Sequence, residues 1–217
     1  HIWPKPFHDA LIDLIGSTSD ITRRSEAVPM MTDLDRRFEV MDMFGPDYCQ
    51  VLSLASPPLE HVTDAPQALE LSRIGTDAMA DLCAKYPERF PAFISTAVMT
   101  DPAGAIAEAR RAIEEAGAAG IQIFTNVKGK PLDAPEFSDF FAYLGEAGKP
   151  VWMHPARGAN FPDYLSETRS EYEIWWTFGW PYETSAAMAR MVFSGFFDKY
   201  PGLKVITHHA GGMGPFF

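Results

Sequence analysis

Short aliphatic runs alternate with longer amphipathic stretches along most of this 217-residue chain, and this alternation limits the fold more than any other feature. The runs lie at residues 50–54, 92–98, 120–124, 150–154 and 203–209. A short apolar run followed by a helical stretch is typical of a βα unit, and repeated βα units build a parallel sheet with crossover helices. The sequence therefore predicts an α/β fold.

Amphipathic stretches between the runs predict the crossover helices. Asp101 before Pro102, and Asp133 three residues before Glu136, supply N-capping signals at two of the helix starts. The predicted helices cover residues 33–44, 64–85, 101–116, 133–147 and 183–199. Segments without a helical period are expected to be loops, at residues 16–31 and 156–181.

The helix predicted after Pro102 separates apolar and charged residues onto two sides, because its alanines and isoleucines repeat with a 3.6-residue period. We expect the charged side to be solvated. It comprises Glu108, Arg110, Arg111, Glu114 and Glu115.

The composition excludes several classes of protein. Asp and Glu number 29 against 18 Lys and Arg, and the formal net charge of −11 would repel nucleic acid and anionic membranes. No apolar run approaches the roughly 20 residues of a membrane span. Cys49 and Cys83 are too few and too isolated for a disulfide framework, so both are expected to be buried thiols. We expect a cytoplasmic protein with no nucleic-acid and no membrane partner.

The number of runs points to a barrel. With one more strand implied before Ile2-Trp3-Pro4 the chain carries about six βα units, and an open sheet of this size would leave two bare edges. A closed TIM-like (β/α)8 barrel avoids bare edges. We therefore expect residues 1–217 to form a single metal-dependent (β/α)-barrel domain, incomplete at both ends, because the chain opens on His1 rather than Met and stops just after a glycine-rich turn.

Three histidines follow the ends of predicted strands, where a barrel of this type places its reacting groups. His154 ends one run, His209 ends the next, and His1 would follow the implied leading strand. A single histidine is more often a core or loop residue, but three at matched strand ends favour a metal site, since zinc prefers imidazole ligands. His8 and His61 have no such placement and are expected in loops.

Several longer motifs match one known family. The match begins at His1-Ile2-Trp3-Pro4 and becomes more specific further on, at Gly120-Ile121-Gln122-Ile123, His154-Pro155, Trp176, Gly179, Pro181, Glu183-Thr184, the run from Tyr200 to Val205, and His209, Gly211, Gly212 and Pro215-Phe216. With these motifs the chain resembles, from His1 to its last residue, the amidohydrolase-related decarboxylases typified by aminocarboxymuconate-semialdehyde decarboxylase.

The resemblance implies roles for the histidines. His1 and His154 would be metal ligands, joined by a histidine before the chain start and an aspartate after the eighth strand. His209 would be the catalytic histidine, since its distance from Pro215 fits the family interval, whereas His208 would support the site or pack against it. The implied cofactor is a divalent metal ion, zinc in the first place and manganese in the second.

Two features of the loop after His154 suit a substrate. Arg157 can pair with a carboxylate through two hydrogen bonds, or be an ordinary surface arginine. The same loop is rich in aromatic residues, namely Trp175, Trp176, Phe178 and Trp180. Their rings can form a flat slot for a planar substrate, or they can cover a barrel end or a subunit interface. The resemblance favours Trp176, so Arg157 and Trp176 are the predicted substrate-binding residues.

A divalent cation beside a histidine suits two kinds of enzyme. A decarboxylase protonates the carbon that bears the carboxylate, whereas a hydrolase directs a metal-bound hydroxide at a carbonyl carbon. The leading hypothesis is a metal-dependent lyase that decarboxylates a small aromatic or unsaturated carboxylic acid. The alternatives are a hydrolase or hydratase acting on an ester, lactone or amide, and a metal-free barrel that serves as a binding or scaffold subunit. We expect a homo-oligomer.

Overall fold

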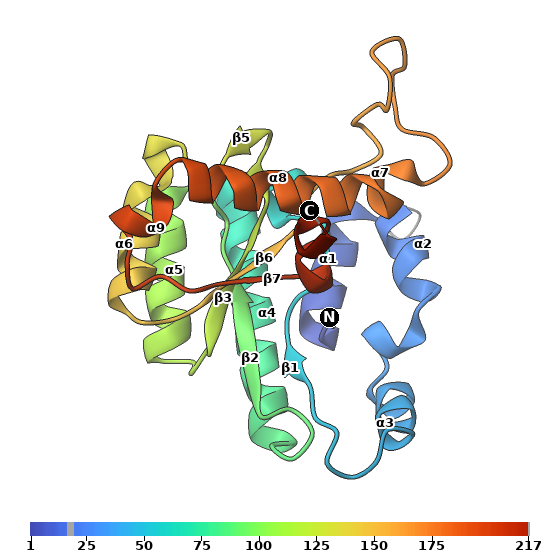
Figure 1. Ribbon diagram of the computed structural model, residues 1–217. Coiled ribbons are helices and arrows are strands. Elements are labelled where there is room, and N and C mark those ends of the chain that lie inside the picture. The colour runs from blue at the N-terminus through green and yellow to red at the C-terminus, as the bar shows by residue number, and fades with distance from the viewer. Residues whose placement is uncertain (17–19, 217) are drawn as a thin grey trace. The chain divides into compact units, whose positions relative to one another are not determined.

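The computed structural model describes residues 1–16 and 20–216 (Figure 1). The chain divides into two compact units, His1–Ile121 and Gln122–Phe217. In the first unit lie β1 (Val51–Leu52), β2 (Ala92–Thr96) and the start of β3 (Gly120–Phe124), with the helices α1 (Lys5–Ile15), α2 (Asp20–Glu26), α3 (Leu34–Asp42), α4 (Ala65–Lys85) and α5 (Pro102–Glu114) and the 3-10 turns η1 (Pro29–Met31) and η2 (Leu59–His61).

The second unit continues β3 and adds β6 (Val151–His154) and β7 (Val205–Thr207), with a small hairpin of β4 (Asn126–Val127) and β5 (Lys130–Pro131). Its helices are α6 (Ser138–Glu146), α7 (Ile174–Thr177), α8 (Gly179–Phe193) and α9 (Phe196–Lys199), and its 3-10 turns are η3 (Pro135–Phe137), η4 (His209–Gly211) and η5 (Gly214–Phe216). Figure 1 shows the segment between β6 and α7 looping away from the helices of this unit.

The strands of the main sheet are hydrogen-bonded in the order β1-β2-β3-β6-β7, which is also their order in the chain. Val51 of β1 lies opposite Ala92 of β2, and Val151 of β6 lies opposite Val205 of β7, in parallel in both pairs. Ile2 forms a parallel bridge to Leu54, at the place of the implied leading strand. The predicted α/β fold with about six βα units is confirmed.

Helix α4 is the centre of packing in the first unit. It lies against β2 on one side, as Figure 1 shows, and against α1 on another. Phe7 of α1 is 1% exposed. The close approach depends on Gly75 of α4, because a Cβ there would lie 2.7 Å from Cδ1 of Leu54 and 3.2 Å from Cδ2 of Phe7. Helix α1 was not predicted; Pro4 precedes it, and a proline at the first turn loses no helical N–H bond.

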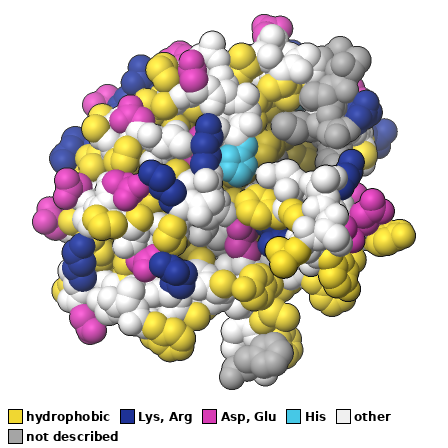
Figure 2. All heavy atoms as spheres, turned by 90° about the horizontal axis from the view of Figure 1, so that it is seen from above, with side chains coloured by type: hydrophobic (Ala, Val, Ile, Leu, Met, Phe, Trp, Pro, Cys, Tyr) yellow, Lys and Arg dark blue, Asp and Glu magenta, His cyan; other side chains and the backbone are white. Residues whose placement is uncertain are grey.

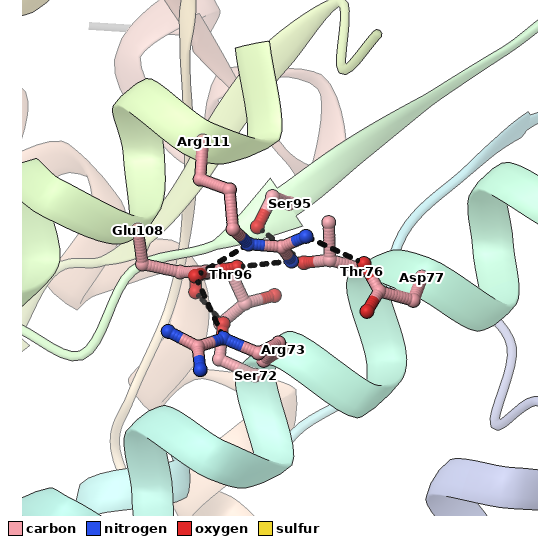
Figure 3. A network of polar contacts seen from close by, with 8 residues as sticks. All are labelled: Ser72, Arg73, Thr76, Asp77, Ser95, Thr96, Glu108 and Arg111. Atoms are coloured by element: carbon pink, nitrogen blue, oxygen red, sulfur yellow. Dashed lines mark hydrogen bonds and ion pairs between the residues drawn. The ribbon is translucent and has the colours of Figure 1, made fainter. Parts of the chain in front are cut away.

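A polar network joins α4, β2 and α5 (Figure 3). The carboxylate of Glu108 accepts hydrogen bonds from Arg111 at 2.7 and 2.9 Å and from Arg73 at 3.4 Å, and Arg111 also donates to Asp77 at 2.8 Å. Glu108 is 5% exposed. The predicted solvated face is therefore wrong at Glu108, because α4 covers this side of α5, and Arg73 and Arg111 supply the positive charge that makes burial of the carboxylate tolerable.

Beneath these ion pairs, α4 bonds to β2 through hydroxyl groups. Ser72 Oγ donates to the carbonyl oxygen of Thr96, and the hydroxyl groups of Thr76 and Ser95 lie 2.7 Å apart. All four residues are buried. Each of these buried hydroxyls has a partner, so the helix sits on the strand without the cost of an unpaired polar group.

Aromatic side chains form the core of the second unit. Phe140, Phe141 and Leu144 of α6 are fully buried. The ring of Phe196 in α9 lies 4.8 Å from both Phe141 and Tyr200, in edge-to-face geometry. These contacts hold α6 and α9 together.

Two predicted helix boundaries differ from the structure. Asp133 does not cap a helix: its carboxylate pairs with Arg190 of α8, at 3.0 Å, and the chain passes through η3 before α6 begins. The helix predicted at 183–199 begins earlier, at Gly179, and is interrupted at Gly195, whose φ of 71° is left-handed. Helices at Leu34 and Pro102 start as predicted, each behind a capping aspartate.

Other expectations for the first unit were wrong. The loop predicted at residues 16–31 contains α2 and η1, while residues 17–19 lie outside the described part of the chain. His8 and His61, expected in loops, lie in α1 and η2. Cys49, which precedes β1, is exposed, and Cys83 is half-buried, so neither is the buried thiol that was expected.

Charged side chains of both signs lie among hydrophobic ones on the face of the molecule seen in Figure 2. Among the described residues, no helix is long and apolar enough to cross a membrane.

Candidate active site

His154 ends β6 and is 2% exposed. Its Nδ1 lies 2.8 Å from the carbonyl oxygen of Pro155. A carbonyl oxygen only accepts hydrogen bonds, so Nδ1 carries the proton of the neutral ring and Nε2 holds the lone pair. Nε2 is therefore the atom that His154 can offer to a metal ion.

Two further histidines follow β7, the neighbour of β6. Nε2 of His209 lies 3.3 Å from Nε2 of His154, and the rings of His208 and His154 are 4.9 Å apart. His209 and Ala210 have φ angles of 53° and 54°, in the left-handed region that side chains disfavour. Strain of this kind clusters at functional sites, and here it accompanies the close approach of two imidazoles.

Burial favours the neutral form of these imidazoles. It lowers the pKa of His154 to about 3, with a smaller contribution from His208, and the pKa of His208 to about 4, with a smaller contribution from His209. Partial burial also lowers the pKa of His209. Neutral imidazole is the form that binds metals. The Nδ1–H group of His154 donates to a carbonyl oxygen, as metal-bound histidines usually do. The residues present therefore fit a divalent metal ion.

A tryptophan wall flanks the histidines. The ring of Trp180 lies 5.1 Å from His154 and 5.3 Å from His209. Trp175 and Trp176 extend the wall, with ring centroids 5.7 and 6.1 Å from Trp180. Trp176 is 42% exposed, so part of the residue faces solvent.

Glu183 of α8 holds the segment that follows His154. One carboxylate oxygen accepts hydrogen bonds from the backbone N–H groups of Ala156 and Arg157, at 2.9 and 2.7 Å, and the other accepts from the side chain of Asn126 at 2.6 Å. Trp180 donates to the carbonyl oxygen of Arg157 at 2.8 Å. The chain leaving β6 is thus fixed by side chains of α8.

Arg157 itself lies within this segment. Its guanidinium donates to the carbonyl oxygen of Pro162 at 3.3 Å and lies 5.4 Å from the centre of the Phe161 ring. The side chain also passes close to Gly179, where a Cβ would lie 2.5 Å from its Cδ. Arg157 is therefore half-buried against its own loop, and its predicted role toward a substrate stays a prediction.

His1 belongs to the first unit, next to the bridge that Ile2 forms with Leu54. Its Nδ1 lies 2.8 Å from the hydroxyl group of Ser53, and its carbonyl oxygen accepts a hydrogen bond from Arg37. Arg37 is 5% exposed and also donates to the carbonyl oxygen of Met30 at 3.0 Å. Ser53 and Arg37 thus fix the backbone and ring of His1.

Of the predicted site residues, the structure brings His154, His208 and His209 together, and connects Trp176 to them through Trp180. Sequence reasoning gave no role to Glu183 or Arg37. Glu183 stands in a run that matches the family, and this is the signal that could have pointed to it. Arg37 had none, because its partners are 7, 13 and 36 residues away.

Comparisons with known proteins agree with this geometry. Residues 1–215 match the family described as Amidohydrolase. The 2-amino-3-carboxymuconate-6-semialdehyde decarboxylase of Dictyostelium discoideum is 34% identical over 167 residues, which are 77% of this chain and 45% of that protein. The chain spans about half the length of the first curated relatives it matches.

Solved structures extend the likeness. The 5-carboxyvanillate decarboxylase of Sphingomonas paucimobilis has a TM-score of 0.81 at 28% identity, over 99% of this chain and 67% of that one. The 5-carboxyvanillate decarboxylase of Novosphingobium aromaticivorans, solved with bound manganese and 3-methoxy-4-hydroxy-5-nitrobenzoic acid, has a TM-score of 0.76 at 30% identity, over 98% of this chain and 62% of that one. The family match over nearly the whole chain, together with histidines at the ends of parallel strands, makes this chain a member of the amidohydrolase family.

Proposed function

We propose that the protein to which this chain belongs is a metal-dependent decarboxylase of small aromatic or unsaturated carboxylic acids. The observation that carries the proposal is the pair of imidazoles at the ends of β6 and β7, with Nε2 atoms 3.3 Å apart beside Trp180. Relatives named for decarboxylation of compounds of this class support it.

In this proposal His1 and His154 are metal ligands, together with groups outside residues 1–217. Manganese is carried by relatives, and zinc, which prefers imidazole nitrogen, remains the other candidate. A divalent cation held there would orient the carboxylate of the substrate and would stabilise negative charge. His209 is the proton donor: once protonated, it delivers its proton to the carbon that bears the carboxylate, and departure of carbon dioxide restores the conjugated system. His208, whose ring lies 4.9 Å from that of His154, packs against it.

Trp176, Trp180 and Arg157 complete the proposed substrate site. The two indole rings offer a flat wall to a planar acid. Arg157 pairs with a carboxylate if its guanidinium leaves the carbonyl oxygen of Pro162. We also propose that residues 1–217 belong to a single barrel domain and that the protein is a cytoplasmic homo-oligomer.

The test uses the full-length natural protein loaded with Mn²⁺ or Zn²⁺. Carbon dioxide release is measured on hydroxybenzoates, a carboxyvanillate and muconate-like acids, in parallel with hydrolysis of aryl esters and lactones. We expect carbon dioxide from at least one acid. Hydrolysis of esters or lactones without any carbon dioxide release would replace the proposal by its hydrolase alternative.

Two variants separate the histidine roles. His154→Ala is expected to lose stoichiometric metal, whereas His209→Ala is expected to keep most of the metal and lose turnover. Equal metal loss in both variants would contradict the assignment.

A further inference from the structure

A single peptide group lies between Glu183 and His154. The peptide that joins Pro155 to Ala156 contributes its carbonyl oxygen to Nδ1 of His154, at 2.8 Å, and its N–H group to the carboxylate of Glu183, at 2.9 Å. The same N–H group also reaches the hydroxyl group of Thr125, at 3.0 Å. Two acceptors therefore hold one side of this peptide, and the histidine ring is held by the other side.

A negative charge beside a peptide N–H polarises the whole peptide group. Hydrogen bonds in a chain strengthen one another in a low-dielectric interior, so the carboxylate makes the carbonyl oxygen of Pro155 a better acceptor. A stronger acceptor at Nδ1 favours the tautomer with the proton on Nδ1 and raises the electron density at Nε2. Carboxylates that contact a metal-bound histidine directly have this effect.

We infer that Glu183 is a positioning residue for His154: through the Pro155–Ala156 peptide, its carboxylate fixes the histidine tautomer that exposes the Nε2 lone pair. Asn126 holds the second carboxylate oxygen at 2.6 Å, which aims the first at the backbone. The metal-binding consequence of this inference rests on the proposed function, but the tautomer does not.

The primary test is the ring tautomer of His154 in the metal-free full-length protein, read from long-range proton–nitrogen NMR correlations. The wild type is expected to carry the proton on Nδ1. Glu183→Gln removes the negative charge. In its place the N–H groups of Ala156 and Arg157 face a side-chain amide, which can donate as well as accept hydrogen bonds. This variant is expected to shift the ring toward a mixture with the Nε2-protonated tautomer. Retention of the pure Nδ1-protonated ring in Glu183→Gln overturns the inference.

The second readout is the Mn²⁺ dissociation constant of the same variants. Loss of a partner behind a ligand histidine typically weakens metal binding by about 10–100-fold, and Glu183→Gln is expected to fall in this range. The matched control is Glu167→Gln, whose carboxylate also accepts from a backbone N–H, that of Tyr164 at 3.1 Å, rather than from the Pro155–Ala156 peptide. The control is expected to keep both the wild-type tautomer and the wild-type affinity; an equal loss in both variants overturns the inference.

Two safeguards keep the outcomes separate. If Glu183→Gln does not fold, Asn126→Ala takes its place, because it frees the carboxylate of Glu183 from its side-chain partner without removing it. Mn²⁺ binding is then expected to weaken about tenfold, at the low end of the same range. An unchanged tautomer and an unchanged affinity in this variant overturn the inference. If the wild type binds no metal, the proposed function fails, and the tautomer comparison alone decides the inference.

Discussion

Replacement of Glu108 by glutamine tests whether the ion pairs between α4 and α5 stabilise the fold. The carboxylate is 5% exposed and accepts two hydrogen bonds from Arg111 and one from Arg73. Glutamine has nearly the same volume but no charge, and its single oxygen can keep one of these bonds. The substitution therefore removes charge-assisted bonds without leaving a cavity.

The size of the effect follows from the exposure of the partners. A hydrogen bond to a charged group contributes about 1.5–3 kcal/mol. The side chains of Arg111 and Arg73 are 23% and 53% exposed, so both recover part of their hydration in the variant. We therefore expect a loss of about 2 kcal/mol, near the low end of that range. In a domain of about 150–250 residues such a loss lowers Tm by about 4–8 °C, and by less in a longer domain.

The measurement is thermal unfolding of the full-length protein by circular dichroism, with Glu114→Gln as the control. Glu114 pairs with Arg110 on the same helix at 3.2 Å, but both side chains are more than half exposed. Exposed pairs of this spacing contribute about 0.3–0.5 kcal/mol, so Tm is expected to fall by no more than about 2 °C in the control. Equal shifts in the two variants would refute the claim that burial makes the Glu108 pairs the stronger ones.

Three further predictions test local features. At pH 8 iodoacetamide is expected to modify exposed Cys49 well before Cys83. Burial raises the pKa of Cys83 to about 11, so little of its reactive thiolate is present until the pH approaches that value. Equal rates of modification at the two thiols, measured by peptide mass spectrometry, would contradict this prediction. Asp33→Ala removes the acceptor for two N–H groups of α3 and should cost about 1 kcal/mol in urea unfolding, and an unchanged midpoint would argue against the cap. Mn²⁺ should quench the tryptophan fluorescence of the wild type more than that of Trp180→Phe, and identical quenching would place the ion away from this ring.

Local chemistry made much of the fold predictable from the sequence. A capping aspartate followed by a 3.6-residue apolar period acts within a few residues of the chain, so the start of α5 behind Asp101 was predicted correctly. The short aliphatic runs likewise identified β2, β3, β6 and β7. Two-sided burial selects such runs in β2, β3 and β6, whose residues are mostly buried, whereas Ile206 of β7 is exposed. His154 and His209 could be singled out for the same reason, since each stands where a run ends.

Long-range partners decided the rest. Asp133 carries a capping signal, but an arginine 57 residues away binds its carboxylate and the helix starts later. Glu108 lies on the polar side of its own helix, and it is buried because α4 packs there and brings Arg73 and Asp77 with it.

The sequence alone determined the class of fold, the family and the candidate metal ligands of this protein. Strand and helix periods, and histidines at strand ends, can each be recognised within a few consecutive residues. Tertiary structure alone decided how near His209 comes to His154 and that Glu183 holds the segment after His154. These properties depend on hydrogen bonds between residues that are 27 to 55 positions apart, such as Ala156 with Glu183 and His154 with His209, and no local pattern encodes the geometry of such contacts.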